Sequence, residues 1–368
     1  MKNSIKGKSF SLITIIILFV MLGVTAFIGY IFDPAMYYRI PNYKTYCTEQ
    51  YTTAGLIKNH SAEVAIIGSS MMQNTNVDLV EELFDKEAIR YTLSGMTIDE
   101  IAMLVNRSLN VENNVDRFII NLDLSMFNSE EKSPFSRLPE YIYDDIKLND
   151  IKYLLGYDTW VKFIPFNFIY NVACNIDSTI TDKISVLFER STNIDLMGNW
   201  SNATNFSEEI VKNGYISGIA AVSEQNLDGM LTRMKSRFDN VIYPLVIENN
   251  NKEFNFIFPP YSILMWYNAE EEGYLEVILK FKEYIVEKFD GLENVKLYDF
   301  QDYEGILDLN NYKDTTHYKP EFNDMMIRCI VNNQSTINIL NMKDRIINIK
   351  EKLELFKENE KDWLNNIK

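Results

Sequence analysis

The stretch Ala65-Ile66-Ile67-Gly68-Ser69-Ser70 runs from apolar residues into a turn of small residues that carries a serine. An unbroken apolar run of this length is typical of a strand buried on both faces of a sheet. Residues 77–85 follow with apolar side chains at helical spacing, and this predicts a helix whose N-terminal amides point towards Ser70. Such a turn can expose a serine hydroxyl as a nucleophile, although an ordinary strand-to-helix turn has the same pattern.

Two more strands are predicted downstream, over residues 88–93 and 117–123. The helix between them begins after Thr97, which has Glu100 three residues on and therefore the spacing of a capping box. Strands and helices that alternate at this spacing predict an α/β fold, a doubly wound parallel sheet with helices on both faces in three layers. In such sheets the site lies beyond the carboxyl ends of the strands. Those ends carry Ser70, Gly95, Asn121 and Asp123.

The sheet pattern is interrupted in the middle of the chain and then resumes. Between about residues 130 and 250 helical periodicity and many aromatic residues predict a helical insertion within an α/β domain that spans residues 61–334. After the insertion, strands are predicted over 254–258 and 295–300, with a helix over 269–288 between them.

The tail, residues 335–368, is predicted to form a long helix. Its apolar residues fall at two heptad positions, and Glu360 is the single break in this pattern. The helix either pairs with another helix, which would allow self-association, or packs on the surface of its own domain. The pattern of one sequence favours neither alternative.

The N-terminal region, residues 1–32, has the features of a membrane anchor. Residues 9–32 contain no charged side chain, and a helix of this length is long enough to cross a bilayer. Bulky residues follow Ala26, so the stretch favours a retained anchor over a cleaved signal peptide. Three lysines precede the stretch, and the positive-inside rule therefore predicts a single-pass cell-membrane protein with a cytoplasmic N-terminus and an extracellular domain.

Residues 33–60 form a juxtamembrane segment that is rich in tyrosine. It is predicted to leave the membrane in extended conformation and to continue as a helix over residues 43–59. The tyrosines either lie at the membrane interface, where aromatic rings with a polar tip are favoured, or pack on the domain.

Composition limits the remaining classes of function. The 368 residues include 46% hydrophobic and 13% aromatic residues, enough for a sizeable core. The formal charge of −16, without a dense basic cluster, disfavours nucleic acid as a partner. The three cysteines (Cys47, Cys174 and Cys329) are far apart and form no C-x-x-C pair, so neither a metal site nor a disulfide framework is indicated. Buried free thiols are expected, and the alternative is that one pair forms a bridge in an oxidising compartment. No cofactor is expected.

The sequence contains only two histidines, His60 and His317. His60 precedes the first strand and is therefore expected at the end of the sheet opposite to Ser70. His317 follows the loop after the last strand, with Asp314 three positions before it. This spacing on a tight turn can bring the carboxylate to Nδ1 of the ring, so that Nε2 faces a nucleophile as the base.

These residues together resemble the SGNH/GDSL hydrolase superfamily. Gly68-Ser69-Ser70 is similar to the family's Gly-Asp-Ser, Gly95 matches its oxyanion glycine, and Asp314-Thr315-Thr316-His317 matches its closing Asp-x-x-His. The resemblance implies a serine esterase or acyltransferase in which Ser70 takes the acyl group, His317 moves the proton and Asp314 holds His317.

This sequence departs from the family's pattern at the third motif. The family has an asparagine side chain that completes the oxyanion hole, whereas the matching position here is Asp123, whose carboxylate would repel an oxyanion. Asn121 lies two residues earlier on the same face of the strand, although deeper, and is a second candidate beside Asp123 to complete the oxyanion hole.

The anchor makes the chain similar to the membrane-tethered branch of this superfamily, which includes the D-alanyl-lipoteichoic acid biosynthesis protein and partners of membrane-bound O-acyltransferases. This resemblance implies acyl transfer to or from a cell-surface polysaccharide or teichoic-acid-type polymer, beside a membrane-bound O-acyltransferase. The alternative is a catalytically silent domain of the same fold that binds a glycan or the partner acyltransferase.

Overall fold

The computed structural model describes residues 2–41, 43, 45, 47–110, 114–176, 205–219 and 227–367. The chain divides into two compact units. The smaller unit comprises Met1–His60 and Arg137–Leu196, and the larger unit comprises Ser61–Ser136 and Met197–Lys368.

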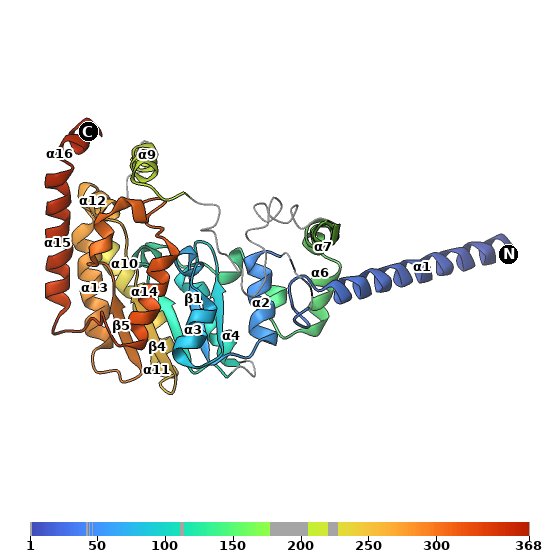
Figure 1. Ribbon diagram of the computed structural model, residues 1–368. Helices are drawn as coiled ribbons and strands as arrows, with labels where there is room; N and C mark the ends of the chain where they lie inside the picture. Colours follow the sequence, from blue (N-terminus) through green and yellow to red (C-terminus); the bar gives the residue numbers. More distant parts are fainter. Residues whose placement is uncertain are drawn as a thin grey trace. The chain divides into compact units, whose positions relative to one another are not determined.

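The larger unit is built on a parallel sheet of five strands in the order β2-β1-β3-β4-β5 (Figure 1). The strands are β1 (Val64–Gly68), β2 (Ala88–Thr92), β3 (Arg117–Asn121), β4 (Glu253–Phe258) and β5 (Val295–Asp299). Every residue of β1 is buried, as its apolar run predicts. The doubly wound α/β fold predicted from the sequence is therefore confirmed.

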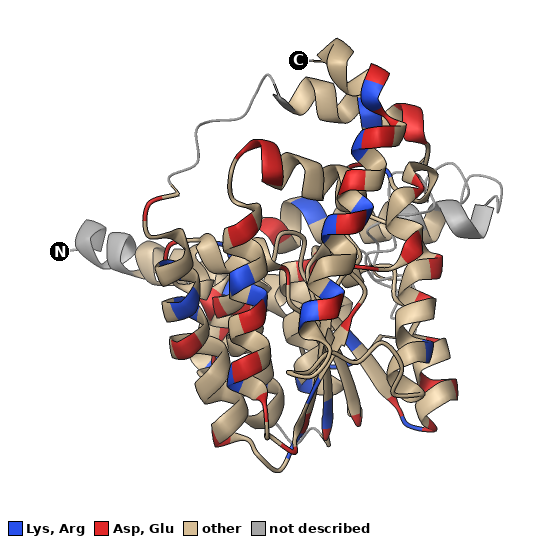
Figure 2. Cartoon of the chain, turned by 90° about the vertical axis from the view of Figure 1, so that its left-hand side faces the viewer, with Lys and Arg blue, Asp and Glu red and all other residues tan. Residues whose placement is uncertain are grey.

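Helices cover both faces of this sheet because right-handed crossovers in opposite directions place them on opposite sides. On one face α3 (Val77–Phe84) contacts α14 (Pro320–Val331), as Figure 1 shows. The other face carries α4 (Ile98–Asn110), α10 (Met230–Arg237) and α13 (Leu275–Phe289). Here Arg237 of α10 forms an ion pair with Asp99 of α4. In the cartoon of Figure 2, the positions of basic and acidic residues are interspersed along the described part of the chain.

The predicted capping box at the start of α4 is confirmed. The backbone N–H of Thr97 donates to Glu100 Oε2 at 2.8 Å, and the backbone N–H of Glu100 donates to Thr97 Oγ1 at 3.3 Å. Two N–H groups that lack partners within the helix are thereby satisfied.

The single helix predicted over residues 269–288 is wrong. The structure has two helices instead, α12 (Ile263–Glu271) and α13, and Gly273 lies between them with a φ of +80°. This left-handed conformation is open to glycine at little cost, and it ends one helix and redirects the chain into the next.

The tail forms α15 (Met342–Asn359) and α16 (Lys361–Ile367), which separate at Glu360 where the heptad pattern breaks. The apolar seam of α15 is buried and packs on α12 and α13, with the Phe356 ring centroid 6.1 Å from that of Tyr267. Lys357 also pairs with Glu270 at 2.8 Å. Of the two alternatives for the tail, the structure shows packing on its own domain.

The smaller unit begins with α1 (Lys2–Phe32), in which Ser9–Phe32 is long and apolar enough to cross a membrane. Only 6% of its most apolar window is buried within the structure. Asp33 follows the helix and is fully buried. Its carboxylate accepts hydrogen bonds from the backbone N–H groups of Tyr37, Tyr38 and Arg39 and from the Tyr153 hydroxyl, at 2.8–3.1 Å. Burial raises the pKa of Asp33, and the three N–H groups oppose this shift.

Short helices complete the smaller unit. They are α2 (Glu49–Asn59), α5 (Glu140–Tyr143), α6 (Asp150–Leu154), a π-helical turn (Asp158–Phe163) and α7 (Ile164–Ile176). Tyr37, Tyr51 and Tyr153 are buried among them, so these tyrosines pack within the protein. The predicted helical insertion is thus partly described, since residues 177–204 and 220–226 lie outside the described part of the chain.

Candidate active site

Ser70 lies at the carboxyl end of β1, where a short 3₁₀ turn, Ser70–Met72, follows the strand. The backbone N–H of Ser69 donates to Asn121 Oδ1 at 3.0 Å and so ties this turn to the end of β3. The connections that follow the neighbouring strands β1 and β3 run to opposite faces of the sheet. Open α/β sheets form their sites at the carboxyl ends of two such strands.

Gly68 is required at this turn because of its close neighbours. A Cβ atom at this position would lie 2.1 Å from Asn121 Oδ1 and 2.7 Å from Met72 Cγ. Real side chains do not approach so closely, so the absence of a side chain at Gly68 allows Asn121 to reach Ser69.

The structure brings His317 to Ser70 and Asp314 to His317. Ser70 Oγ lies 2.7 Å from His317 Nε2, and His317 Nδ1 lies 2.7 Å from Asp314 Oδ2. A carboxylate only accepts hydrogen bonds, so Nδ1 donates to Asp314, and in the tautomer with a single proton on Nδ1 the Nε2 atom is left to accept from the Ser70 hydroxyl. This is the geometry of a serine nucleophile, its base and the group that orients the base.

Asp314 is held as a carboxylate by its surroundings. Its Oδ1 accepts the backbone N–H groups of Thr316 at 2.9 Å and His317 at 2.8 Å. Burial raises the pKa of Asp314, but the side-chain hydrogen bond and charge of His317 and the two N–H groups outweigh it and lower the pKa to about 2. The group is therefore ionised at neutral pH, the state that orients an imidazole.

Tyr318, directly after His317, and Asn323 of α14 both contact the serine turn. Tyr318 Oη donates to the Met71 carbonyl at 3.0 Å, and Asn323 Nδ2 donates to the same carbonyl at 2.9 Å and to Thr75 Oγ1 at 3.2 Å. Tyr318 and Asn323 are buried. They were not predicted as site residues, and the residue types alone give no signal that they contact Met71.

The predicted oxyanion residues have different surroundings. Gly95 is exposed and has a φ of +61°, a left-handed turn that favours glycine. Asp123 Oδ1 accepts hydrogen bonds from the Ser125 backbone N–H at 3.0 Å, the Ser125 hydroxyl at 2.7 Å and the Tyr261 hydroxyl at 2.7 Å. Asn121 is fully buried and uses its Oδ1 for Ser69, while its Nδ2 makes no hydrogen bond with the described residues. The role of Asn121 or Asp123 in an oxyanion hole stays a prediction.

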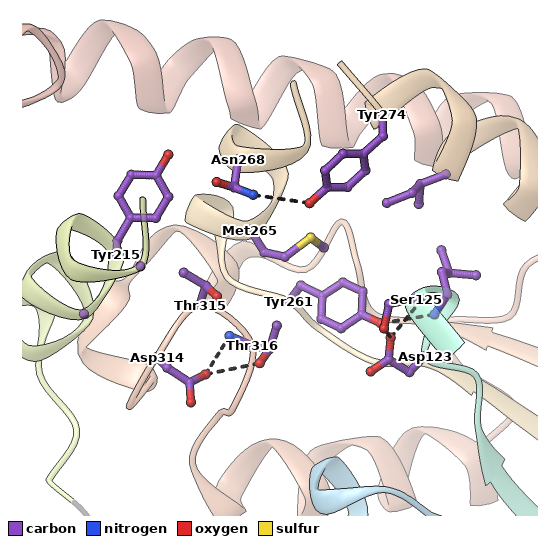
Figure 3. Close-up of a pocket in the computed structure, with 14 residues that line it drawn as sticks. Asp123, Ser125, Tyr215, Tyr261, Met265, Asn268, Tyr274, Asp314, Thr315 and Thr316 are labelled. Atoms are coloured by element: carbon purple, nitrogen blue, oxygen red, sulfur yellow. Dashed lines mark hydrogen bonds between the residues drawn. The ribbon is translucent and has the colours of Figure 1, made fainter. Parts of the chain in front are cut away.

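A cavity of about 420 Å³ adjoins the acid end of this arrangement (Figure 3). Asp314, Thr315 and Thr316 line it, whereas Ser70 and His317 are not among its lining residues. The described residues contain no group of three or more His, Cys, Asp or Glu side chains placed to hold a metal ion. Cys47 and Cys329 are free thiols.

Comparison with known proteins identifies no family. No protein-family model and no curated protein matches the chain. A solved structure from Streptococcus pneumonia, named for platelet activating factor, is similar at 10% sequence identity with a TM-score of 0.36. The match covers 77% of this chain and 91% of that chain. A likeness of this degree assigns no activity, so the function must be argued from the geometry.

Proposed function

We propose that Ser70, His317 and Asp314 form a catalytic triad and that the chain is a serine-dependent O-acyltransferase or esterase. The observation that carries this proposal is the continuous hydrogen-bonded series from Ser70 Oγ through His317 to Asp314, with both side-chain distances at 2.7 Å. A structural turn has no need of a histidine between a serine and a carboxylate, whereas nucleophilic catalysis depends on it.

The proposed reaction has two steps. In the first, Ser70 Oγ attacks the carbonyl carbon of an ester, His317 Nε2 takes the serine proton, and the same nitrogen then protonates the leaving alcohol. An acyl-Ser70 ester results. In the second step, His317 deprotonates an acceptor hydroxyl or water, which attacks this ester and releases the acyl group, and Ser70 regains a proton from His317. Asp314 remains ionised throughout and stabilises the charged imidazolium.

The oxyanion of each tetrahedral intermediate needs hydrogen-bond donors. We assign this role to backbone N–H groups at Ser70 and Gly95, which lie at the carboxyl ends of β1 and β2. Asp123 does not serve as a donor in this proposal, because its carboxylate is engaged as an acceptor by Ser125 and Tyr261. Asn121 supports the turn that presents Ser70 through its contact with Ser69.

The apolar helix Ser9–Phe32 supports a setting at the cell membrane. We propose that it is a retained anchor, that the N-terminus is cytoplasmic and that the domain acts outside on a cell-surface polymer, beside a membrane-bound O-acyltransferase. Full-length protein in the membrane fraction, with its C-terminus cut by protease added outside, is the expected result. A shortened soluble form that begins after about residue 26 would show cleavage instead.

A fluorophosphonate probe tests the enzymatic proposal, since it forms a covalent bond only with an activated serine. The wild type is expected to be labelled, and Ser70→Ala and His317→Ala are expected to lose the label. His60→Ala is the matched histidine control and should retain it, because His60 precedes β1 whereas Ser70 follows it. Equal weak labelling of the wild type and Ser70→Ala would refute the proposal.

A second candidate function is a silent domain that binds a glycan or an acyltransferase. The observation in its favour is that a carboxylate, Asp123, stands where the resemblance expects the oxyanion asparagine, and that it accepts hydrogen bonds from Ser125 and Tyr261. The same labelling experiment separates the two, because a silent domain leaves Ser70 unreactive.

A further inference from the structure

The cavity beside Asp314 is formed by four parts of the larger unit. The loop of Asp314 supplies one wall, and α12 and the start of α13 supply another. The residues that follow β3, from Asp123, form a third wall, and α9 (Glu208–Ile219) supplies a fourth through Tyr215 and two glycines. Helix α9 is fixed to this unit by Lys212, which pairs with Glu360 at 2.6 Å.

The charge of the cavity has one sign. Asp123 and Asp314 are its only charged lining residues among those that the structure describes, and neither lysine, arginine nor histidine lines it. Asp314 is ionised at neutral pH by the hydrogen bonds described above. Two carboxylates without a compensating cation in the wall repel a phosphate or carboxylate group that enters the cavity.

The rest of the cavity lining is largely aromatic and apolar, and such a surface can pack against a ring that carries hydrogen atoms on its carbons. Tyr215, Tyr261 and Tyr274 surround the cavity, with Met265 between them, as Figure 3 shows. Tyr215 is held in place by ring contacts with Tyr267, at 6.3 Å between centroids, and with Trp363 at 6.1 Å. Rigid aromatic rings of this kind provide apolar contact area at low cost in conformational entropy.

Hydrogen-bond acceptors stand at two places in the cavity, one on α12 and one directly after β3. The Asn268 side chain donates to Glu272 at 2.8 Å and to Tyr274 at 3.3 Å, and its Oδ1 accepts no hydrogen bond from the described residues. Asp123 uses Oδ1 for its contacts, and its Oδ2 accepts none from the described residues. Hydroxyl groups of a ligand can donate to both acceptors.

We infer that this cavity binds a neutral sugar residue of the substrate. The polymer on which the chain acts is then an uncharged polysaccharide rather than a polyol phosphate, and this inference rests on the proposed function. Because Ser70 and His317 do not line the cavity, the bound sugar is a neighbour of the reacting ester and positions it. Binding energy gained away from the reacting bond lowers the barrier to acylation when it holds the ester in position.

Three fluorophosphonates with the same reactive end test the inference. One carries a glucosyl group, the second carries the same glucosyl group with a 6-phosphate, and the third carries a trimethylammonium group. The measurement is the second-order rate constant for labelling Ser70 in the full-length protein. The glucosyl probe is expected to react at least tenfold faster than the phosphorylated probe, and faster than the ammonium probe.

Variants of the wall sharpen the test. Asp123→Asn keeps the shape and removes one negative charge, so it should reduce the preference for the glucosyl over the phosphorylated probe at least threefold. Tyr215→Ala should slow the glucosyl probe at least fivefold. The matched control is Tyr157→Ala, which removes a tyrosine that is 68% exposed and belongs to the other unit, and it should leave all three rates unchanged.

The outcomes separate this inference from the proposed function. If no probe labels Ser70, the proposed function fails. If Ser70 is labelled but the phosphorylated or the ammonium probe reacts as fast as the glucosyl probe, the sugar site is refuted and the triad stands. A preference for the glucosyl probe that Asp123→Asn and Tyr215→Ala both leave unchanged would also refute the site, since the selection would then arise elsewhere.

Discussion

Asp314→Asn replaces one carboxylate oxygen of the triad by an NH₂ group. The hydrogen bonds of Asp314 determine how this changes the tautomer of His317. In the wild type Asp314 Oδ1 accepts two backbone N–H groups, from Thr316 and His317, and Oδ2 accepts His317 Nδ1–H. An asparagine keeps only one oxygen. If this oxygen retains the two backbone bonds, the amide NH₂ faces Nδ1. The ring must then accept at Nδ1 and carry its proton on Nε2, which can no longer take the proton of Ser70.

The expected loss is large for activity and small for stability. The same change of tautomer in a well-studied serine triad lowers turnover by about 10⁴-fold, and we expect a reduction of that order in the labelling rate of Ser70. The pKa of Asp314 falls from 3.8 to about 2 in the folded protein, equivalent to about 2 kcal/mol before solvent screening. Because the Asp314 side chain is 42% exposed, about 1 kcal/mol is the appropriate estimate.

The sign of the pH dependence follows from the lowered pKa. The contribution of Asp314 to stability is complete above about pH 4 and is lost as the pH falls towards about 2. The unfolding temperatures of wild type and Asp314→Asn should therefore converge over this range. The rate of Ser70 labelling is measured at neutral pH from samples quenched at successive times, and the unfolding temperatures are measured by circular dichroism. A rate for Asp314→Asn within tenfold of the wild type would refute the orienting role.

Three further substitutions have expected results. Gly68→Ala should lower Ser70 labelling at least about 100-fold, because its Cβ displaces the Asn121 side chain, and retention of the wild-type rate would contradict the steric argument. Lys282→Met leaves the fully buried Asp299 without its partner at 2.6 Å and should lower the free energy of unfolding by about 3–5 kcal/mol in denaturant titration; a change below about 1 kcal/mol would count against it. Ile346→Asp places a charge in the buried seam of α15 and should lower the unfolding temperature with the mass in detergent unchanged, whereas a lower mass would indicate self-association.

Short-range patterns explain why much of the fold could be predicted. The apolar run of β1, the Thr97–Glu100 pair and the Asp314–His317 spacing are local, and each is sufficient to determine a local structure. The break between α12 and α13 was missed because one glycine in a helical pattern is tolerated in many helices, and only the φ of Gly273 shows that it ends this one.

The contacts that hold the serine turn in place could not be predicted, because they join distant parts of the chain. Ser69 and Asn121 are 52 residues apart, and Asn323 and Met71 are 252 apart. The sequence makes Asn121 a candidate donor for an oxyanion and gives no sign that its oxygen accepts from the serine turn. The packing of residues 137–176 with the first 60 residues is equally non-local, because no local pattern pairs Tyr153 with Asp33.

The buried carboxylate of Asp33 fixes the path of the chain directly after α1. It gathers four donors immediately after Phe32, so the chain leaves α1 through a tightly bonded turn rather than a loose linker. Gly29 also lies so close to the Leu154 carbonyl that a Cβ would come within 2.8 Å of it. If α1 is the membrane anchor proposed above, a change in its orientation would be passed to α6 rather than absorbed by a flexible connection. One residue inserted before Phe32 would turn the preceding part of the helix by about 100° relative to α6.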